Sequence, residues 1–403
     1  MMKTVLKNIG QLVTWDEDKG QMVILENQDL EIALDRIFSV GASIKAKDAR
    51  EVNCLNCVVT PAFIDPHTHP VFADMRRKEF ELRVQGADYE TIAAAGGGIL
   101  NSVASLRKIS EDELFDRSFP RVKRFLEYGT ATIEAKSGYG LTKDDELKSL
   151  RVIRRLNEAL SLDLIPTFLG AHEIPEEYRD QREKYIRLIT DEMIPAVAEE
   201  KLAVYCDVFT EKTVFSRDET DKIFAAAQAH GLRLRIHADE FSAIGGTELA
   251  VSRHADSADH LMRVSEEGIR ALKNSHTTAI VLPGTTFFLG KTEYAPARRM
   301  WDEGVRVALA TDFNPGSSMT QNLSVILTLA CVYMHLTPLE AIQAVTWHSA
   351  CSLGLESDRG ILAPGKRADI AVWNVRDYRD LAYWYGMNHL KMLFKNGVRE
   401  EYA

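Results

Sequence analysis

Histidine and aspartate side chains follow several apolar runs in this sequence, and their spacing predicts a metal site. His67 and His69 come directly after the run AFID, separated by one residue. Residues i and i+2 of a strand point to the same side, so we expect the two imidazoles to project together. His237, His260 and Asp312 end three later apolar runs. Three histidines and one aspartate can bind a divalent transition metal while leaving a position for water.

Each of these residues also has a simple structural explanation. A histidine pair at a strand end is often solvated, His237 alone fits a hydrogen-bonded core position, and Asp312 alone fits a helix cap or a turn. The prediction therefore depends on whether the fold brings the strand ends to one place.

Eight short apolar segments alternate with helical patterns, which predicts a (β/α)8 TIM-like barrel over residues 58–360. Two of the helical patterns, 111–129 and 217–231, end at Gly129 and Gly231. In such a barrel the carboxyl ends of the strands meet at one rim, where catalytic groups collect. The expected strands are 58–65, 130–136, 163–170, 202–209, 232–238, 256–261, 277–283 and 305–312.

A doubly wound open sheet is the alternative to a barrel. It requires a glycine-rich phosphate loop after the first strand. The glycine-rich segment AAAGGGIL (93–100) lacks that spacing and has no strand directly before it, and we interpret it as a mobile loop.

The two ends of the chain differ from its middle. Residues 1–57 carry short β-like runs, and residues 361–403 return to this style with RADIAVWNV and LKMLFKNGVREEY. We expect these two segments to form one small composite β-sandwich domain beside the barrel.

Composition excludes several classes of protein. The 403 residues are 45% hydrophobic and carry a net charge of −10, which is typical of a soluble globular protein and argues against nucleic-acid binding. We find neither a secretory signal nor an apolar stretch of about 20 residues that predicts a membrane span. Five cysteines indicate reduced thiols and a cytoplasmic location, and we interpret Cys54 and Cys57 as buried thiols.

The order of these motifs resembles the amidohydrolase superfamily. Further segments resemble its imidazolonepropionase family along essentially the whole chain, namely DPHTHPVFADMRRKEFELRVQGADYETIAAAGGGI, EAKSGYGL, FLGAHEIP, HADEF and TDFNPGS. The resemblance implies hydrolysis of the cyclic amide of 4-imidazolone-5-propanoate to N-formimino-L-glutamate, in histidine degradation. It also implies a homodimer.

The resemblance further implies a ligand set and proton-handling groups. His67, His69, His237 and Asp312 are expected to hold one divalent ion, zinc or iron. The general base and acid are expected among Glu240, His260 and Asp312, with Glu240 and His260 favoured for proton handling.

Substrate contacts are also implied by the resemblance. Arg76 is expected to bind the propanoate, because a guanidinium binds carboxylates through paired hydrogen bonds. Asp74, close to Arg76, departs from the family pattern and is expected to weaken that attraction. The other implied substrate contacts are Tyr89, Tyr139, His172, Asn314, Gly316 and Ser317.

Three alternative functions remain open on the sequence. The first is another mononuclear amidohydrolase, a cyclic amidase or deaminase, acting on a small carboxylate-bearing heterocycle. The second is a binuclear enzyme, which would recruit a carboxylated lysine on a middle strand; LAVYCDVF has none there, and Lys136 is an imperfect candidate on the second strand. The third is a non-catalytic binding protein, which would be expected to have lost a ligand or a proton-handling residue.

Overall fold

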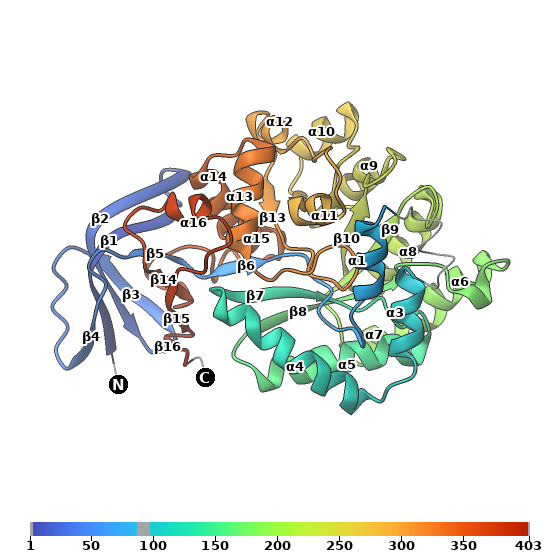
Figure 1. The fold of residues 1–403 in the computed structure, drawn as a ribbon, viewed down its shortest axis with the longest axis horizontal. Coiled ribbons are helices and arrows are strands. Elements are labelled where there is room, and N and C mark those ends of the chain that lie inside the picture. Colours follow the sequence, from blue (N-terminus) through green and yellow to red (C-terminus); the bar gives the residue numbers. More distant parts are fainter. Residues whose placement is uncertain (1–2, 87–96, 402–403) are drawn as a thin grey trace.

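The computed structural model describes residues 3–86 and 97–401 and contains two eight-stranded sheets (Figure 1). In one sheet every neighbouring pair is parallel and the strands follow chain order from β6 to β13. These strands are β6 (Phe63–Asp65), β7 (Thr130–Lys136), β8 (Asp163–Ala171), β9 (Tyr205–Thr210), β10 (Arg233–Ala238), β11 (Ser257–His260), β12 (Thr278–Val281) and β13 (Val307–Leu309). The predicted barrel is thereby confirmed.

The prediction that residues 58–65 form one strand is wrong. The segment 58–65 divides at Ala62 into β5 (Val58–Pro61) and β6, and the two parts join different sheets. Both parts are fully buried, so the sequence is apolar throughout and gives no sign of the division.

Helices follow most barrel strands and cover the outside of the barrel (Figure 1). They are α1 (Arg77–Val84), α3 (Ile99–Leu106), α4 (Glu111–Glu127), α5 (Lys143–Ala159), α6 (Arg182–Leu188), α7 (Ile194–Glu199), α8 (Arg217–Ala229), α9 (Gly246–Ser252), α10 (Glu266–Lys273), α11 (Pro283–Phe288), α12 (Ala297–Asp302), α13 (Leu323–Met334), α14 (Pro338–Ala344), α15 (Trp347–Ser352) and α16 (Asp380–Tyr383), with a π-helical turn, η2 (Ile189–Met193), between α6 and α7 and a short 3₁₀ turn, η1 (Glu176–Tyr178). Within the described ranges, no helix has the length and apolar character needed to cross a membrane.

Local sequence explains the ends of the two predicted helices. Ser110 caps α4 by accepting a hydrogen bond from Glu113, and Ser216 forms a capping box with Glu219 at α8. Gly129 follows α4 at a positive φ of 79°, where a residue without a Cβ avoids strain. The predicted loop 93–100 lies partly outside the described residues, and its last two residues already belong to α3.

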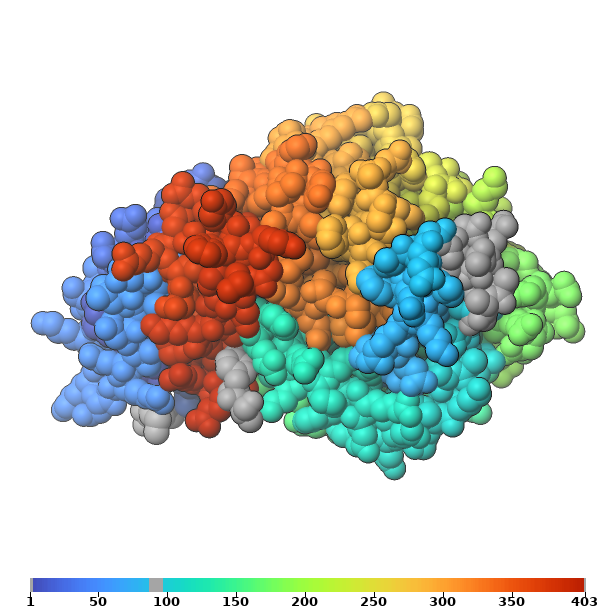
Figure 2. All heavy atoms as spheres, viewed as in Figure 1, coloured from blue at the N-terminus to red at the C-terminus, as the bar shows by residue number. Residues whose placement is uncertain are grey.

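The second sheet joins the two ends of the chain, which lie side by side at one end of the molecule (Figure 2). Its order is β16-β15-β14-β5-β1-β2-β3, with β4 also paired to β1. Its further strands are β1 (Lys3–Asp16), β2 (Gln21–Ala33), β3 (Arg36–Gly41), β4 (Ala49–Asn53), β14 (Ile370–Trp373), β15 (Leu390–Lys395) and β16 (Val398–Arg399). An apolar cluster that includes Leu30, Val59 and Ile370 forms a separate small core, so the predicted small domain from both termini is confirmed.

The barrel closes between its first and last strands at the HTH segment itself. The amide of Asp312 donates to the His67 carbonyl at 3.1 Å, and the amide of His69 donates to the Phe313 carbonyl at 2.9 Å. Below these bonds, the Asp65 carboxylate accepts hydrogen bonds from the amide and hydroxyl of Thr311. The first and last chemistry-bearing segments of the sequence are therefore held together by backbone pairing.

Candidate metal centre and active site

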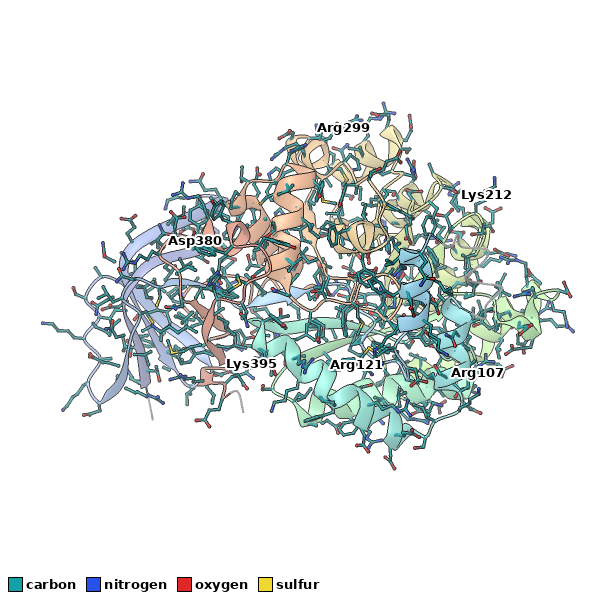
Figure 3. The ribbon with its side chains drawn as sticks, in the orientation of Figure 1. Arg107, Arg121, Lys212, Arg299, Asp380 and Lys395 are labelled. Atoms are coloured by element: carbon teal, nitrogen blue, oxygen red, sulfur yellow. The ribbon has the colours of Figure 1, made fainter. Side chains whose placement is uncertain are left out.

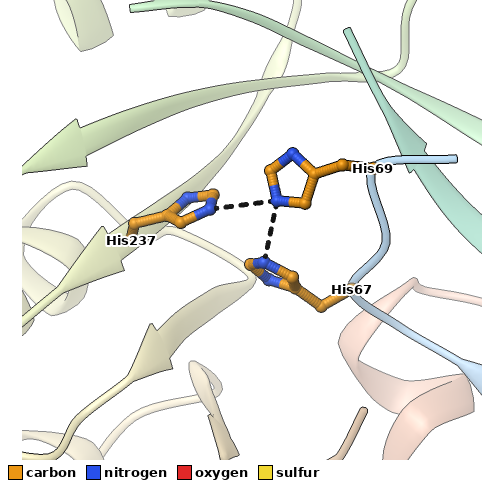
Figure 4. A group of neighbouring side chains, drawn as sticks. All are labelled: His67, His69 and His237. Carbon is orange, nitrogen blue, oxygen red and sulfur yellow. Dashed lines mark hydrogen bonds between the residues drawn. The ribbon is translucent and has the colours of Figure 1, made fainter. Parts of the chain in front are cut away.

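Three imidazoles converge at the rim where the barrel closes (Figure 4). His69 Nε2 lies 3.3 Å from His67 Nε2 and 3.4 Å from His237 Nε2. All three side chains are buried. The structure therefore brings together three of the four residues predicted as ligands. Two of them follow β6, and the third lies on β10.

Carboxylates behind two of these rings fix the direction of their lone pairs. His67 Nδ1 lies 2.7 Å from Asp259 Oδ2, and His237 Nδ1 lies 3.1 Å from Asp207 Oδ1. A carboxylate accepts the Nδ1 proton, which leaves the Nε2 lone pairs of His67 and His237 directed at His69 Nε2. Nitrogen lone pairs that converge in this way repel unless a proton or a metal ion lies between them, so this donor set fits a bound metal ion.

Protonation of the imidazoles competes with metal binding. Burial lowers the pKa of His67 and of His69 well below the usual value, which keeps both neutral. Burial also acts on His237, but the Asp207 carboxylate outweighs it and raises the pKa of His237. A proton therefore competes with a metal ion mainly at His237 Nε2.

The fourth predicted ligand, Asp312, lies against the same cluster. Its Oδ1 is 3.5 Å from the Nε2 atoms of both His67 and His69. Its Oδ2 accepts a hydrogen bond of 2.6 Å from the Thr285 hydroxyl, which fixes the carboxylate orientation. Burial raises the pKa of Asp312 to about 6.

Glu240 and His260 form a second pair beside the imidazole cluster. His260 Nδ1 lies 3.7 Å from Glu240 Oε2, and the His260 ring centroid lies 5.2 Å from that of His237. Burial, followed by the charge of Asp312, raises the pKa of Glu240 to about 8, while burial keeps the pKa of His260 well below its usual value. A carboxyl that titrates near neutral pH suits proton transfer in both directions.

Strained backbone accompanies these positions. His260 and Asp312 have positive φ values of 79° and 51°, which residues with a Cβ rarely adopt. Asp239, next to Glu240, has a φ of 51° and accepts a hydrogen bond from Thr247. Such strain clusters at functional sites, where the surrounding structure holds it in place.

The raised pKa of Glu240 predicts a pH dependence of stability in the metal-free protein. The unfolded chain ionises Glu240 near its ordinary pKa of 4.5, whereas the folded chain keeps the proton until about pH 8. Stability should therefore fall as pH rises between these values, by up to about 1.4 kcal/mol per pH unit from this group. Glu240→Gln should remove that slope in urea unfolding measured with a chelator present. Equal slopes for the two proteins would show that Glu240 ionises normally.

Arg76 lies beside the turn that follows Asp312. A Cβ on Gly316 would clash with the Arg76 guanidinium, so glycine at this position lets the two approach closely. Arg76 Nη2 pairs with Glu79 at 2.6 Å, which leaves part of the guanidinium for another acceptor. Asp74 pairs with Arg117 at 2.6 Å, and Glu79 is the acid that contacts Arg76, so the expected weakening of Arg76 by Asp74 stays a prediction.

Tyr139 and His172 extend the rim on the other side of the cluster. The His172 ring stacks on His69 with centroids 5.2 Å apart, and it lies 5.4 Å from the Tyr139 ring. Glu146 holds the loop that carries Tyr139, since it accepts hydrogen bonds from the amides of Gly138, Gly140 and Leu141. Tyr89, another predicted contact, lies outside the described residues.

The turn after Asp312 is held by hydrogen bonds between its own residues. Asn314 Oδ1 accepts from the amides of Gly316 and Ser317 at 2.8 Å each. Asn314 Nδ2 donates to the Asp312 carbonyl and to the Ser317 hydroxyl. The Asn314 side chain therefore shapes the turn, and the Ser317 hydroxyl lies 3.5 Å from Asp312 Oδ2.

Several residues of the site escaped sequence reasoning. Asp207 and Asp259 orient His237 and His67, Thr285 orients Asp312, and Glu134 lies under them inside the barrel. The sequence identifies Lys136, which pairs with Glu134, only as an imperfect candidate for a carboxylated lysine. The charged residues among them could have been found from the sequence, because each interrupts an apolar strand that is expected to be buried. A buried ionised group needs a partner, so such an interruption indicates a polar site inside the barrel. Thr285 carries no such signal.

A (β/α)8 barrel with imidazoles and carboxylates converging at the closing rim is the arrangement of metal-dependent hydrolases. Residues 58–399 match the model of the amidohydrolase family, to which this chain therefore belongs.

Within that family, the chain is similar to proteins named imidazolonepropionase. One from Bacillus velezensis is 42% identical over 405 residues, covering 98% of this chain and 96% of its own length. Another, from Geobacillus thermodenitrificans, is 44% identical over 94% of this chain and 92% of its own. The resemblance seen in the sequence is confirmed.

Solved structures share the fold at low sequence identity. A triazine hydrolase variant superposes with a TM-score of 0.80 at 16% identity, covering 98% of this chain and 94% of that chain. Atrazine chlorohydrolase from Arthrobacter aurescens, complexed with zinc, gives a TM-score of 0.77 at 15% identity, covering 99% and 95% of the two chains. These structural similarities support the assignment of the barrel fold.

Proposed function

We propose that this chain hydrolyses the cyclic amide of 4-imidazolone-5-propanoate to N-formimino-L-glutamate in histidine degradation. The observation that carries the proposal is the convergence of three imidazole Nε2 atoms beside the Glu240–His260 pair, in a chain whose relatives are imidazolonepropionases. The test is mass spectrometry of the product from purified, metal-loaded protein, which should show the substrate plus one water. An unchanged substrate mass would count against the proposal.

The proposed cofactor is one divalent ion, zinc or iron, held by His67, His69, His237 and Asp312. When bound, such an ion lowers the pKa of water and polarises a carbonyl oxygen. The donor set supports this proposal because imidazole nitrogens and one carboxylate oxygen suit both metals.

Proton handling is proposed for Glu240, with His260 and Asp312 beside it. Water adds to the ring carbonyl carbon, the carbon–nitrogen bond breaks, and the ring nitrogen takes up a proton. Glu240 is proposed to accept the water proton and to return it to that nitrogen. Its raised pKa of about 8 supports the return of the proton, whereas the accepting step requires the ionised carboxylate, whose fraction grows as the pH rises towards 8.

Substrate binding is proposed at the rim around these groups. Arg76 binds the propanoate, Tyr139 and His172 contact the ring, and the turn that contains Gly316 and Ser317 offers further hydrogen bonds. The proximity of Arg76 to Gly316 supports this arrangement. Asn314 is proposed to hold the turn, and Tyr89 remains a proposed contact from the sequence resemblance.

Arg76→Ala should raise KM and lower kcat/KM by about 10–100-fold, because it removes a charge-assisted pair worth roughly 1.5–3 kcal/mol. The value of kcat should change little, since the pair forms in both the bound substrate and the transition state. Steady-state kinetics with the propanoate-bearing substrate measures both values. The control is Arg77→Ala, which removes an exposed arginine one residue away. Equal effects of the two substitutions would point to general surface charge instead of a specific contact.

We further propose a cytoplasmic homodimer. All five cysteines are free, which supports a reducing compartment. Exposed Val332, Tyr333, Tyr383 and Tyr385 line one surface groove, and an apolar surface of this kind supports self-association. Light scattering on the purified protein measures the mass, and a monomer at micromolar concentration would contradict the dimer.

A further inference from the structure

Lys136 lies inside the barrel, directly under the imidazole cluster, with its side chain fully buried. Its Nζ is 2.8 Å from Glu134 Oε1, 2.7 Å from Asp207 Oδ2 and 3.9 Å from Asp259 Oδ2. One ammonium group thus faces three buried carboxylates that come from β7, β9 and β11.

Each of these carboxylates forms a hydrogen bond to a histidine of the cluster or to the backbone beside it. Asp207 contacts His237 Nδ1, and Asp259 contacts His67 Nδ1. Glu134 Oε2 accepts a hydrogen bond of 3.2 Å from the Thr68 amide, which lies between His67 and His69. The Lys136 amide also donates to the Thr68 carbonyl at 3.0 Å. Lys136 Nζ therefore contacts the carboxylates that orient the His67 and His237 rings, and also Glu134, which binds the backbone between His67 and His69.

The charges in this region require a cation at the Lys136 position. Glu134, Asp207 and Asp259 are fully buried, and the only other buried cation near them in the described residues is Arg235, at 3.9 Å from Glu134 and 3.8 Å from Asp259. Burial disfavours the charged lysine, but Asp207 and Glu134 outweigh it and raise the pKa of Lys136. A carboxylated Lys136 would add a further negative charge beside three carboxylates, at high cost in a buried site.

We propose that Lys136 is a positioning residue whose ammonium takes the place of a second metal ion beneath the three histidines. It holds Asp207, Asp259 and Glu134 in the geometry that aims the imidazoles, and it limits the site to a single metal. This inference rests on the proposed metal site, and it accounts for the proposed single divalent ion above five buried ionisable groups.

The test compares Lys136→Gln with Lys395→Gln in the full chain. Lys395 is a matched control, because its Nζ is equally buried between two carboxylates, Asp163 and Asp369, each at 2.9 Å (Figure 3 labels Lys395). Lys395 lies on β15 and contacts none of the residues around the histidines. Zinc affinity is measured by competition with a chromophoric chelator, and zinc content by elemental analysis.

Lys136→Gln should weaken zinc binding by about 10–100-fold, the range found when a partner of a metal ligand is lost. Lys395→Gln should lower the unfolding temperature and leave zinc affinity unchanged. Wild-type affinity in Lys136→Gln, or equal losses in both variants, would overturn the inference. Wild-type protein that binds no zinc would instead refute the proposed metal site itself, and wild-type protein with two zinc ions per chain would refute the single-metal role of Lys136.

A second measurement needs no substitution and applies if Lys136→Gln does not fold. Wild-type protein incubated with ¹³C-bicarbonate should show no carbamate carbon signal by NMR, because Lys136 remains an ammonium group. A carbamate carbon signal in the folded wild-type protein that is absent from Lys136→Arg would overturn the inference.

Discussion

Glu240→Gln is expected to lower kcat by about 10²–10⁴-fold, the contribution typical of a positioned acid–base group. Glutamine keeps the shape of the side chain and removes its ability to accept the water proton. Because Glu240 is not among the proposed ligands, metal content should stay at the wild-type value. Rapid kinetics and elemental analysis on the same preparation measure both quantities.

The matched control for this substitution is Glu248→Gln. Glu248 lies on α9 and accepts a hydrogen bond from Ser265, outside the imidazole cluster. It should retain wild-type kcat. If Glu240→Gln also retained wild-type kcat, Glu240 would have no part in proton transfer, and the remaining candidates would be His260 and Asp312.

His237→Ala is expected to abolish activity through loss of the metal. It removes one of three convergent Nε2 donors and leaves the Asp207 carboxylate without its imidazole partner. We expect metal affinity to fall by more than the roughly 10–100-fold seen when only a supporting residue is lost. Elemental analysis after gel filtration measures bound metal, and kcat/KM should fall in proportion to occupancy.

His348→Ala provides the comparison for His237→Ala. His348 is also a buried histidine, but its Nδ1 contacts the Val307 carbonyl and its Nε2 contacts Gln343. Its loss should reduce stability while full metal content remains. A His237→Ala protein that kept stoichiometric metal and activity would contradict the proposed ligand set.

Much of this arrangement could be predicted because strand geometry ties sequence spacing to direction. His67 and His69 point the same way because they are two residues apart after a strand. His237, His260 and Asp312 share a rim because all parallel barrel strands end on the same side. The fold and the family are confirmed by the structure and by the relatives, whereas the role of each residue stays a prediction until its variant is measured.

Other features depend on contacts between distant segments that spacing does not encode. Arg76 and Asp74 are close in sequence, but side-chain rotamers and neighbouring helices pair Asp74 with Arg117 and Arg76 with Glu79. The division at Ala62 depends on β5 pairing with β14, more than 300 residues later. Lys136 looked like an imperfect metal-site lysine, because its three carboxylate partners come together only in the folded barrel.

The most direct test of the central claim is hydrolysis of freshly generated 4-imidazolone-5-propanoate by the purified protein, before and after treatment with a chelator. We expect N-formimino-L-glutamate to form in the metal-loaded protein, to stop forming after chelation and to form again when zinc or iron is restored. No product from protein that carries one metal ion per chain would contradict the substrate assignment. Full activity in protein shown to be metal-free would contradict the metal site.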